Sequence, residues 1–472
     1  MWANLRPALL VAQREVRDQF RDWRIIFPVL GLTIFFPFLM NFTASQILNF
    51  VKEYDATIIG ERLVPFLMMI VGFFPISVSL VIALESFVGE KERGSIEPLL
   101  NTPLKDWQLY LGKLLSSTAP PLFSSFIGMS VYVVGLMIQQ IRLPDLDQLF
   151  LIITMTIVQA LLMVSGAVVV STQATSVRSA NLLASFIIIP MALLIQGESI
   201  IMFWGDYRLL WLVTFGLLVL NFLMIRVGLA HFQREELLGR EIDVLNFKWG
   251  WRVFKKAFAG NARNAVDWYR HSLPAALSRL KRPIAVTFAM VVVGAIAGSL
   301  VANQYADSLN GFHIGNMGDR LQGLLQEWPL FSTGSLIAVW WQNIRALILG
   351  TVLGAISLSI LGMLPALATA GVLGFMLGLV NLNGIPLLTF FAGFILPHGL
   401  FEIPAMVIAT AAILQAGALL ATPRVGKTIG EVWITSFGEW AKIMVGVVIP
   451  LLFVAAAVEV WVTPRIAYLI FK

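Results

Sequence analysis

Two ionisable side chains at a functional spacing interrupt an apolar stretch of the sequence. His398 and Glu402 stand four residues apart in L-P-H-G-L-F-E-I-P-A, so they share one face if the segment is helical. Pro397 and Pro404, with Gly399 between them, favour a broken helix here. The pair could relay a proton, bind a metal ion or clamp two helices. Because one His and one Glu supply only two ligands and no second His is nearby, we predict no metal site.

Other polar residues also fall inside long apolar stretches, where charged side chains are costly and are functional candidates by default. A clamp that joins His398 or Glu402 to another helix is favoured over transport chemistry, because buried polar groups need partners whatever their function. An intramembrane enzyme is a weaker alternative, since the sequence shows no nucleophile or metal for it. The predicted intramembrane polar cluster comprises Asn343, Arg345, His398, Glu402 and Glu459.

One stretch resembles a phosphate-binding loop. A-T-P-R-V-G-K-T at 421–428 fits a relaxed nucleotide-binding pattern, with Ala in the first Gly position. The chemistry requires a strand before the loop and a helix after it, whereas this stretch follows a predicted membrane helix and contains Pro423. We therefore predict no catalytic residue and no cofactor bound by this chain.

The composition places these residues in a membrane. Hydrophobic residues make up 58% of the 472 residues and charged residues 13%, whereas soluble domains carry about 25% charged residues. The absence of cysteine excludes disulfides, thiol catalysis and Cys-ligated metals. The net charge of +6 is explained by basic cytoplasmic loops rather than by nucleic-acid binding. The predicted fold class is all-α, a polytopic membrane protein.

About eleven stretches are long and apolar enough to be membrane helices. They are 25–43, 63–84, 114–139, 149–171, 181–197 and 209–230, then 284–302, 332–362, 366–380, 385–420 and 443–463. Because 332–362 and 385–420 exceed one crossing, each should contain a break, a re-entrant piece or an interfacial helix. Most of the 33 Lys and Arg residues fall inside if the N-terminus is cytoplasmic, which is the orientation we predict.

Two polar segments flank the first two predicted spans. Residues 8–24 form a predicted amphipathic helix with Leu9, Val16, Phe20 and Trp23 on one stripe, suited to the inner headgroup layer. The segment 85–113 directly follows the second span and is too polar to enter lipid. Its Gly and Pro residues predict tight turns and short helices. A rigid loop of this kind could receive force from a cytoplasmic partner.

Both segments carry a family pattern. R-E and R-D before the first span, and E-x-x-x-G-E-K-E-R-G-S-I-E-P-L-L-x-T-P after the second, resemble the membrane subunits of type-2 ABC transporters over about residues 1–235. The resemblance implies six spans, a paired permease and two separate ATP-binding subunits that drive export. It also implies docking of those subunits on Arg14, Glu15, Arg21, Asp22, Glu85, Gly89, Glu90, Lys91, Glu92, Arg93, Gly94, Glu97, Pro98 and Pro103.

The second half resembles a different family. I-L-P-H-G-L-F-E-I-P-A at 395–405, with the nearby glycines, is similar to the stage II sporulation protein M family over about 284–465. This resemblance implies a fold more than an activity. Gly350 with Gly354, and Gly374 with Gly378, have G-x-x-x-G spacing, which favours close helix packing. The same spacing would also allow a dimer face.

The sequence therefore predicts a permease domain over 1–230, a basic amphipathic cytoplasmic linker over 231–283 and a sporulation-protein-M-like membrane domain over 284–472. The predicted function is the permease subunit of an ATP-driven ABC exporter in the inner (plasma) membrane. ATP and Mg²⁺ would be bound by a partner ATP-binding subunit, and the permease would form a homodimer or a pair in contact with lipid. The alternative is a non-transporting membrane scaffold, or an envelope-remodelling module, powered by an ABC ATPase.

Overall fold

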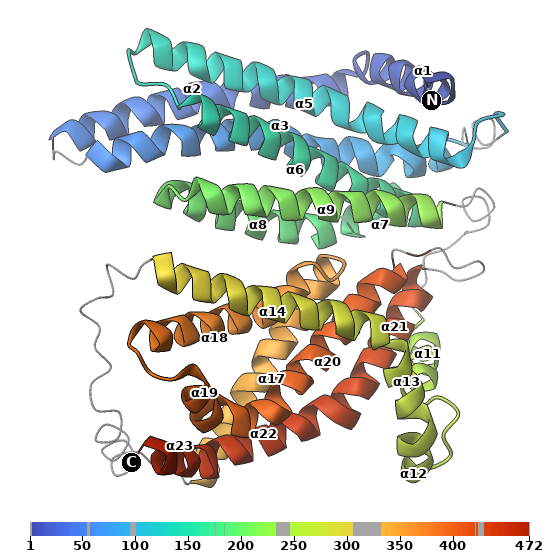
Figure 1. Cartoon of the computed structure of the whole chain (residues 1–472). Coiled ribbons are helices and arrows are strands. Elements are labelled where there is room, and N and C mark those ends of the chain that lie inside the picture. The colour runs from blue at the N-terminus through green and yellow to red at the C-terminus, as the bar shows by residue number, and fades with distance from the viewer. Residues whose placement is uncertain are drawn as a thin grey trace. The chain divides into compact units, whose positions relative to one another are not determined.

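The computed structural model describes residues 2–53, 57–94, 101–174, 176–183, 185–232, 246–304, 332–420, 422 and 429–471. Within these ranges the chain is helical and has no strand, which confirms the predicted all-α class (Figure 1). Eleven helical stretches in the same ranges are long and apolar enough to cross a membrane, as predicted. The chain divides into two compact units, one of residues 1–245 and one of Asn246–Leu420 with Arg424–Lys472.

The first unit is built around one long central helix, α3, which packs against α2, α5 and α6. Met68 and Met69 of α3 are buried against Tyr132 of α5 and Met155 of α6. The Tyr132 hydroxyl donates a hydrogen bond to the Val64 carbonyl at 3.3 Å, which satisfies its polar atom inside the core. The described helices are α1 (Trp2–Gln19), α2 (Trp23–Glu53), α3 (Thr57–Glu92), α5 (Asp106–Ile138), α6 (Leu146–Gln173), α7 (Val177–Leu183), α8 (Ser185–Trp204) and α9 (Tyr207–His231).

Helices α3 and α5 are longer than one bilayer crossing. The 36 residues of α3 and the 33 of α5 extend about 54 Å and about 50 Å, against about 30 Å of hydrocarbon. Residues 85–92 continue α3, and residues 106–113 begin α5. The prediction of a separate loop over 85–113 was therefore wrong at both ends, because a helix continues with polar residues once it has left the lipid.

The second unit contains the remaining helices, with α20 at its centre. α20 packs against α14, α17, α21 and α22. α11–α13 lie at one end of this unit, and α19 and α23 at the other (Figure 1). The elements are α11 (Phe247–Ala259), α12 (Ala265–Asp267), η1 (Trp268–Ser272), α13 (Leu273–Arg279), α14 (Lys281–Gln304), α17 (Thr333–Ile356), η2 (Leu361–Met363), α18 (Leu364–Leu382), α19 (Leu387–Phe390), η3 (Phe391–Ile395), α20 (Leu396–Leu420), α21 (Ile429–Ile443), η4 (Met444–Val448), α22 (Ile449–Trp461) and α23 (Thr463–Phe471).

Residues 246–283 of the predicted linker fold onto the second unit. α11 and α13 both pack on α21. The rings of Phe254 and Phe437 lie 5.9 Å apart, and Arg279 forms an ion pair with Glu439 at 2.9 Å. This segment is thus an ordered part of the second unit, whereas 233–245 of the predicted linker lie outside the described residues.

One of the two over-long apolar stretches contains a break. α17 ends at Ile356, and Leu358 and Ser359 adopt left-handed backbone with φ of 47° and 79°. The Ser359 hydroxyl donates to the Ile413 carbonyl and accepts from the Gly417 amide, which fixes this turn on α20.

The other stretch continues as a helix, so the break predicted around His398 was wrong. A π-helical turn, η3, leads directly into α20, which passes both Pro397 and Pro404. Pro397 follows the π-helical turn directly, where the regular hydrogen-bond pattern of the α-helix is already interrupted. His398 and Glu402 therefore share one helical face.

The small residues of the second unit pack its own helices together. A Cβ added to Gly374 would overlap the Ala295 carbonyl of α14, and one added to Gly378 would lie 2.6 Å from the Ala302 Cβ. A Cβ added to Gly350 would lie 3.1 Å from the Gly362 carbonyl oxygen. These glycines are covered by other helices of the same unit. They therefore do not form the dimer face that their spacing would allow.

Candidate functional site

A buried lysine joins three helices at the predicted docking end of the first unit. The Lys113 Nζ of α5 lies 3.0 Å from Glu15 Oε1 of α1 and 2.6 Å from Glu90 Oε1 of α3. The Lys113 side chain is 1% exposed, and the two glutamates are 21% and 22% exposed. The ammonium also lies 5.7 Å from the centre of the Phe87 ring. We name Glu15, Glu90 and Lys113 the α1–α3–α5 junction.

Small residues bring α1 and α5 close enough for this junction to form. Ala8 and Ala12 of α1 are buried, and a Cβ added to Gly112 of α5 would lie 2.8 Å from the Val11 Cβ. The apolar stripe that includes Leu9 was predicted as the distinctive face of α1, but Leu9 is 48% exposed. The packed face consists of small residues instead, because close helix approach requires them. The larger apolar residues are left free to contact lipid headgroups.

The end of α3 is also held by α6 and α7. The Ser171 hydroxyl of α6 donates to the Leu84 carbonyl and accepts from the Phe87 amide at 3.1 Å. The Glu92 carboxylate accepts a hydrogen bond from the Val177 amide at 2.8 Å, at the beginning of α7. A carboxylate at this position interacts favourably with the unpaired amides of a helix start. Displacement of the α3 end would therefore reach α6 and α7 as well as α1 and α5.

The structure places the predicted docking residues in three groups. Arg14 and Glu15 lie on α1, and Arg21 and Asp22 lie between α1 and α2. Glu85, Gly89, Glu90, Lys91 and Glu92 lie in the last turns of α3, and Arg93 and Gly94 follow its end, with Gly94 at a φ of 67°. Pro103 precedes α5, whereas Glu97 and Pro98 lie outside the described residues. Of these residues, Glu15 and Glu90 are brought together by Lys113.

Sequence reasoning missed a buried carboxylate in the first unit. Glu198 of α8 is 1% exposed, and its Oε2 accepts a hydrogen bond from the Gln159 Nε2 of α6 at 2.5 Å. The signal that selected Glu459, a charged residue inside an apolar stretch, applies equally to Glu198. Glu198 was not selected because the fifth predicted span ended at residue 197, whereas α8 continues to Trp204.

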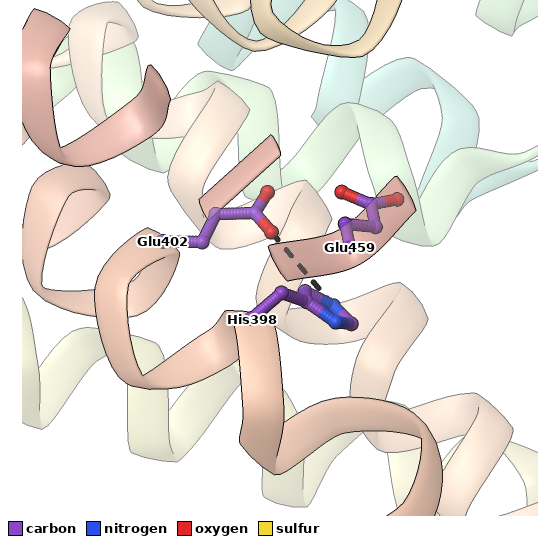
Figure 2. Close-up of side chains that lie close together, drawn as sticks. All are labelled: His398, Glu402 and Glu459. Atoms are coloured by element: carbon purple, nitrogen blue, oxygen red, sulfur yellow. Dashed lines mark ion pairs between the residues drawn. The ribbon is translucent and has the colours of Figure 1, made fainter. Parts of the chain in front are cut away.

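The second unit brings three predicted polar residues together. His398 and Glu402 of α20 face Glu459 of α22 (Figure 2). The His398 Nε2 lies 3.9 Å from Glu402 Oε2, and one ligand atom from each of the three residues lies within 4.8 Å of the others. The His398 Nδ1 lies 3.1 Å from the Thr463 hydroxyl of α23. We name His398, Glu402 and Glu459 the HEE cluster.

The other two members of the predicted polar cluster are not part of this arrangement. Asn343 and Arg345 both lie on α17, and neither makes a hydrogen bond or an ion pair with the HEE cluster among the described residues. Arg345 is exposed, and the Asn343 Nδ2 is buried without a described hydrogen-bond partner. The hydrogen-bond partner of His398 on another helix is therefore Thr463, which the sequence did not indicate.

Family comparisons match the two halves separately. Residues 9–203 match the model of the ABC-2 family transporter proteins, and residues 285–464 match that of stage II sporulation protein M. The chain joins a domain of each family. No curated protein and no solved structure gives a match. The ABC-2 match supports a membrane permease of the ABC transporter type for residues 9–203, and eleven candidate spans among the described residues indicate a multi-pass membrane protein.

The two matched ranges contain most of the candidate residues. The ABC-2 range includes the α1–α3–α5 junction, every predicted docking residue and Glu198. The sporulation protein M range includes the HEE cluster and Thr463, but not α11–α13, which precede it. The P-loop-like stretch 421–428 lies outside the described residues apart from residue 422.

Proposed function

We propose that this chain is the membrane-spanning permease subunit of an ATP-driven ABC exporter in the inner (plasma) membrane. ATP and Mg²⁺ are bound on separate subunits, which dock on α1 and on the segment between α3 and α5. The N-terminus is cytoplasmic, and two permease domains pair to enclose the substrate path. The α1–α3–α5 junction is the observation that carries this proposal.

The junction suits force transfer because it is both buried and charged. The two Lys113 ion pairs tie α1 and the α3 end to α5, so a push on either docking element moves the base of α5. α3 and α5, with 36 and 33 residues, both continue from the docking end into an apolar stretch long enough to cross the membrane, so each connects the two. A flexible loop at the same place would absorb the displacement instead.

Glu198 is a buried polar group between two helices of the permease domain. Its carboxylate lies between α6 and α8 and is bonded to Gln159. Buried ionisable groups in membrane helices commonly line substrate or ion paths. We therefore place Glu198 near the substrate path that the paired permease domains enclose.

The docking proposal is tested with charge reversal at exposed residues. Arg14 is 76% exposed and faces Asp18 at 3.9 Å, and Arg93 is exposed just beyond α3. Neither substitution removes a member of the junction, but Arg14 also interacts electrostatically with Glu90, so elution at the wild-type volume in size-exclusion chromatography is required to confirm that the Arg14→Glu/Arg93→Glu variant is folded. We expect at least about tenfold less ATP-binding subunit to co-purify in mild detergent, since like charges at an interface cost several kcal/mol.

Arg142→Glu is the matched control. Arg142 is also 76% exposed and faces Asp145 at 3.7 Å, but it follows α5, on the opposite side of the membrane in the proposed topology. Equal loss of the ATP-binding subunit in both variants would argue against docking on α1 and α3. Absence of any ATP-binding subunit from the wild-type preparation would overturn the proposal altogether.

Export is separated from scaffolding by comparing two strains. One lacks this chain, and the other carries a hydrolysis-deficient ATP-binding subunit that still binds the permease. An exporter leaves the same compound accumulated inside both strains in lipid and metabolite profiles. No common compound, together with the same envelope defect in both strains, would support the ATPase-powered scaffold or remodelling module.

A further inference from the structure

We propose that the HEE cluster is a binding site for a divalent transition metal ion, with Zn²⁺ as the best fit. The ligands are His398 Nε2 and one carboxylate oxygen each from Glu402 and Glu459. The site lies in the sporulation protein M domain, apart from the proposed docking elements, so its test is independent of the exporter proposal.

The three ligand atoms already lie near metal-binding distances. They fall within 4.8 Å of one another, and the His398 Nε2 is 3.9 Å from Glu402 Oε2. Ligands about 2.0–2.1 Å from a tetrahedral ion stand about 3.4 Å apart. The glutamate side chains can close this difference by torsion alone, without movement of α20 or α22. The sequence argument against a metal counted two ligands, and the fold supplies Glu459 as the third.

Thr463 fixes the imidazole in the form that a metal requires. Its hydroxyl donates a hydrogen bond to the Val458 carbonyl at 3.3 Å, so its oxygen is left to accept from His398 Nδ1 at 3.1 Å. The Nδ1 then carries the proton, and Nε2 presents its lone pair toward Glu402. Such a second hydrogen bond is the usual companion of a metal-ligating histidine.

The two carboxylates of the HEE cluster also favour the binding of a cation. Glu402 and Glu459 are only partly exposed, and neither forms an ion pair with a Lys or Arg among the described residues. Two neighbouring carboxylates with a neutral imidazole repel each other in such surroundings. A divalent ion between them neutralises both and links α20 to the end of α22.

The donor set and the exposure favour Zn²⁺. One imidazole nitrogen and two carboxylate oxygens are all common Zn²⁺ ligands, whereas Mg²⁺ and Ca²⁺ prefer six or more oxygens. Side-chain exposures of 18% for His398 and 28% for Glu402 leave room for water in the fourth position. Glu459 lies two residues before the end of α22, near one end of the span, so an ion can reach the site without crossing the bilayer.

The test is metal content of the full-length protein in detergent, purified with an affinity tag that contains no histidine. The protein is stripped with a chelator, offered Zn²⁺, Mn²⁺ or Fe²⁺ in turn, desalted and analysed by elemental mass spectrometry. We expect one Zn²⁺ per chain in the wild type and a rise in melting temperature on its addition. Glu459→Gln and His398→Asn should lose both responses, and Thr463→Val should bind about 10- to 100-fold more weakly.

His271→Asn is the matched control, because His271 also pairs with a carboxylate four residues away, Asp267, but in an exposed position. It should bind Zn²⁺ as the wild type does. A wild type that takes up no ion overturns the site, and the cluster is then a proton-sharing clamp. Uptake that Glu459→Gln leaves unchanged also overturns it. Elution at the wild-type volume in size-exclusion chromatography confirms that each variant is folded.

Discussion

Replacement of the buried lysine gives the most direct test of the α1–α3–α5 junction. Lys113→Met keeps most of the length of the side chain and removes its charge. At an effective dielectric constant of about 20, an ion pair at 2.6 Å is worth about 6 kcal/mol and one at 3.0 Å about 5.5 kcal/mol, before desolvation is subtracted. The substitution leaves the largely buried carboxylates of Glu15 and Glu90 without the ammonium group that they share, and breaking a buried pair in this way costs about 3–5 kcal/mol.

The loss is measured from the unfolding of the purified protein, followed by the fluorescence of its 14 tryptophans. For a unit of about this size, 3–5 kcal/mol corresponds to a melting temperature lower by about 6–20 °C. Combining Lys113→Met with Glu15→Gln and Glu90→Gln removes all three charges and should restore most of the loss, because a whole buried triad can be replaced at little cost.

Lys105→Met is the control, since Lys105 is exposed just before α5. It should change stability by no more than about 0.5 kcal/mol. The reasoning is refuted if Lys113→Met behaves like this control. It is also refuted if the triple variant is less stable than Lys113→Met, because the charges would then not act as one unit.

Two further predictions concern packing and burial. Gly374→Ala should destabilise the second unit by about 1–3 kcal/mol in thermal unfolding, because the new methyl group meets the Ala295 carbonyl. Gly371→Ala is the control, because its new methyl group would lie 3.9 Å from the nearest atom, the Gly294 carbonyl oxygen. Gln159→Leu should cost about 1–3 kcal/mol, because Glu198 loses its hydrogen bond in a buried position. Adding Glu198→Leu should recover part of that loss, and a fully additive double variant would show that the two residues do not interact.

Residues far apart in the sequence decide both candidate sites. Glu15 and Lys113 are 98 residues apart, and Glu90 and Lys113 are 23 apart. Each was visible as a charged residue in or beside a family motif, but no local pattern indicated that Lys113 is their common partner. Similarly, His398 and Glu402 were predicted to share a face from their spacing alone, whereas Thr463 became their neighbour only through the packing of α23.

The apolar middle of each membrane helix was predicted better than its ends. Inside the bilayer, apolar composition sets the extent of a span, because every backbone group must be bonded within the helix. Outside it, the same pattern stops although the helix continues, as at 85–92 of α3 and 106–113 of α5. The fifth span was predicted too short for a related reason, because the carboxylate of Glu198 was taken as the end of the apolar run. Glu198 was therefore not recognised as a residue inside a membrane helix.

The sequence by itself determined that this protein is a helical membrane protein, with eleven candidate spans among the described residues, and that it combines domains of two families. These properties follow from local composition and from contiguous motifs, which need no knowledge of distant residues. The tertiary structure decided which polar groups meet. It placed Lys113 between two glutamates, buried Glu198 against Gln159 and brought Glu459 to His398 and Glu402. The physical reason is that a buried charge is stable only beside a partner, and helix packing chooses that partner.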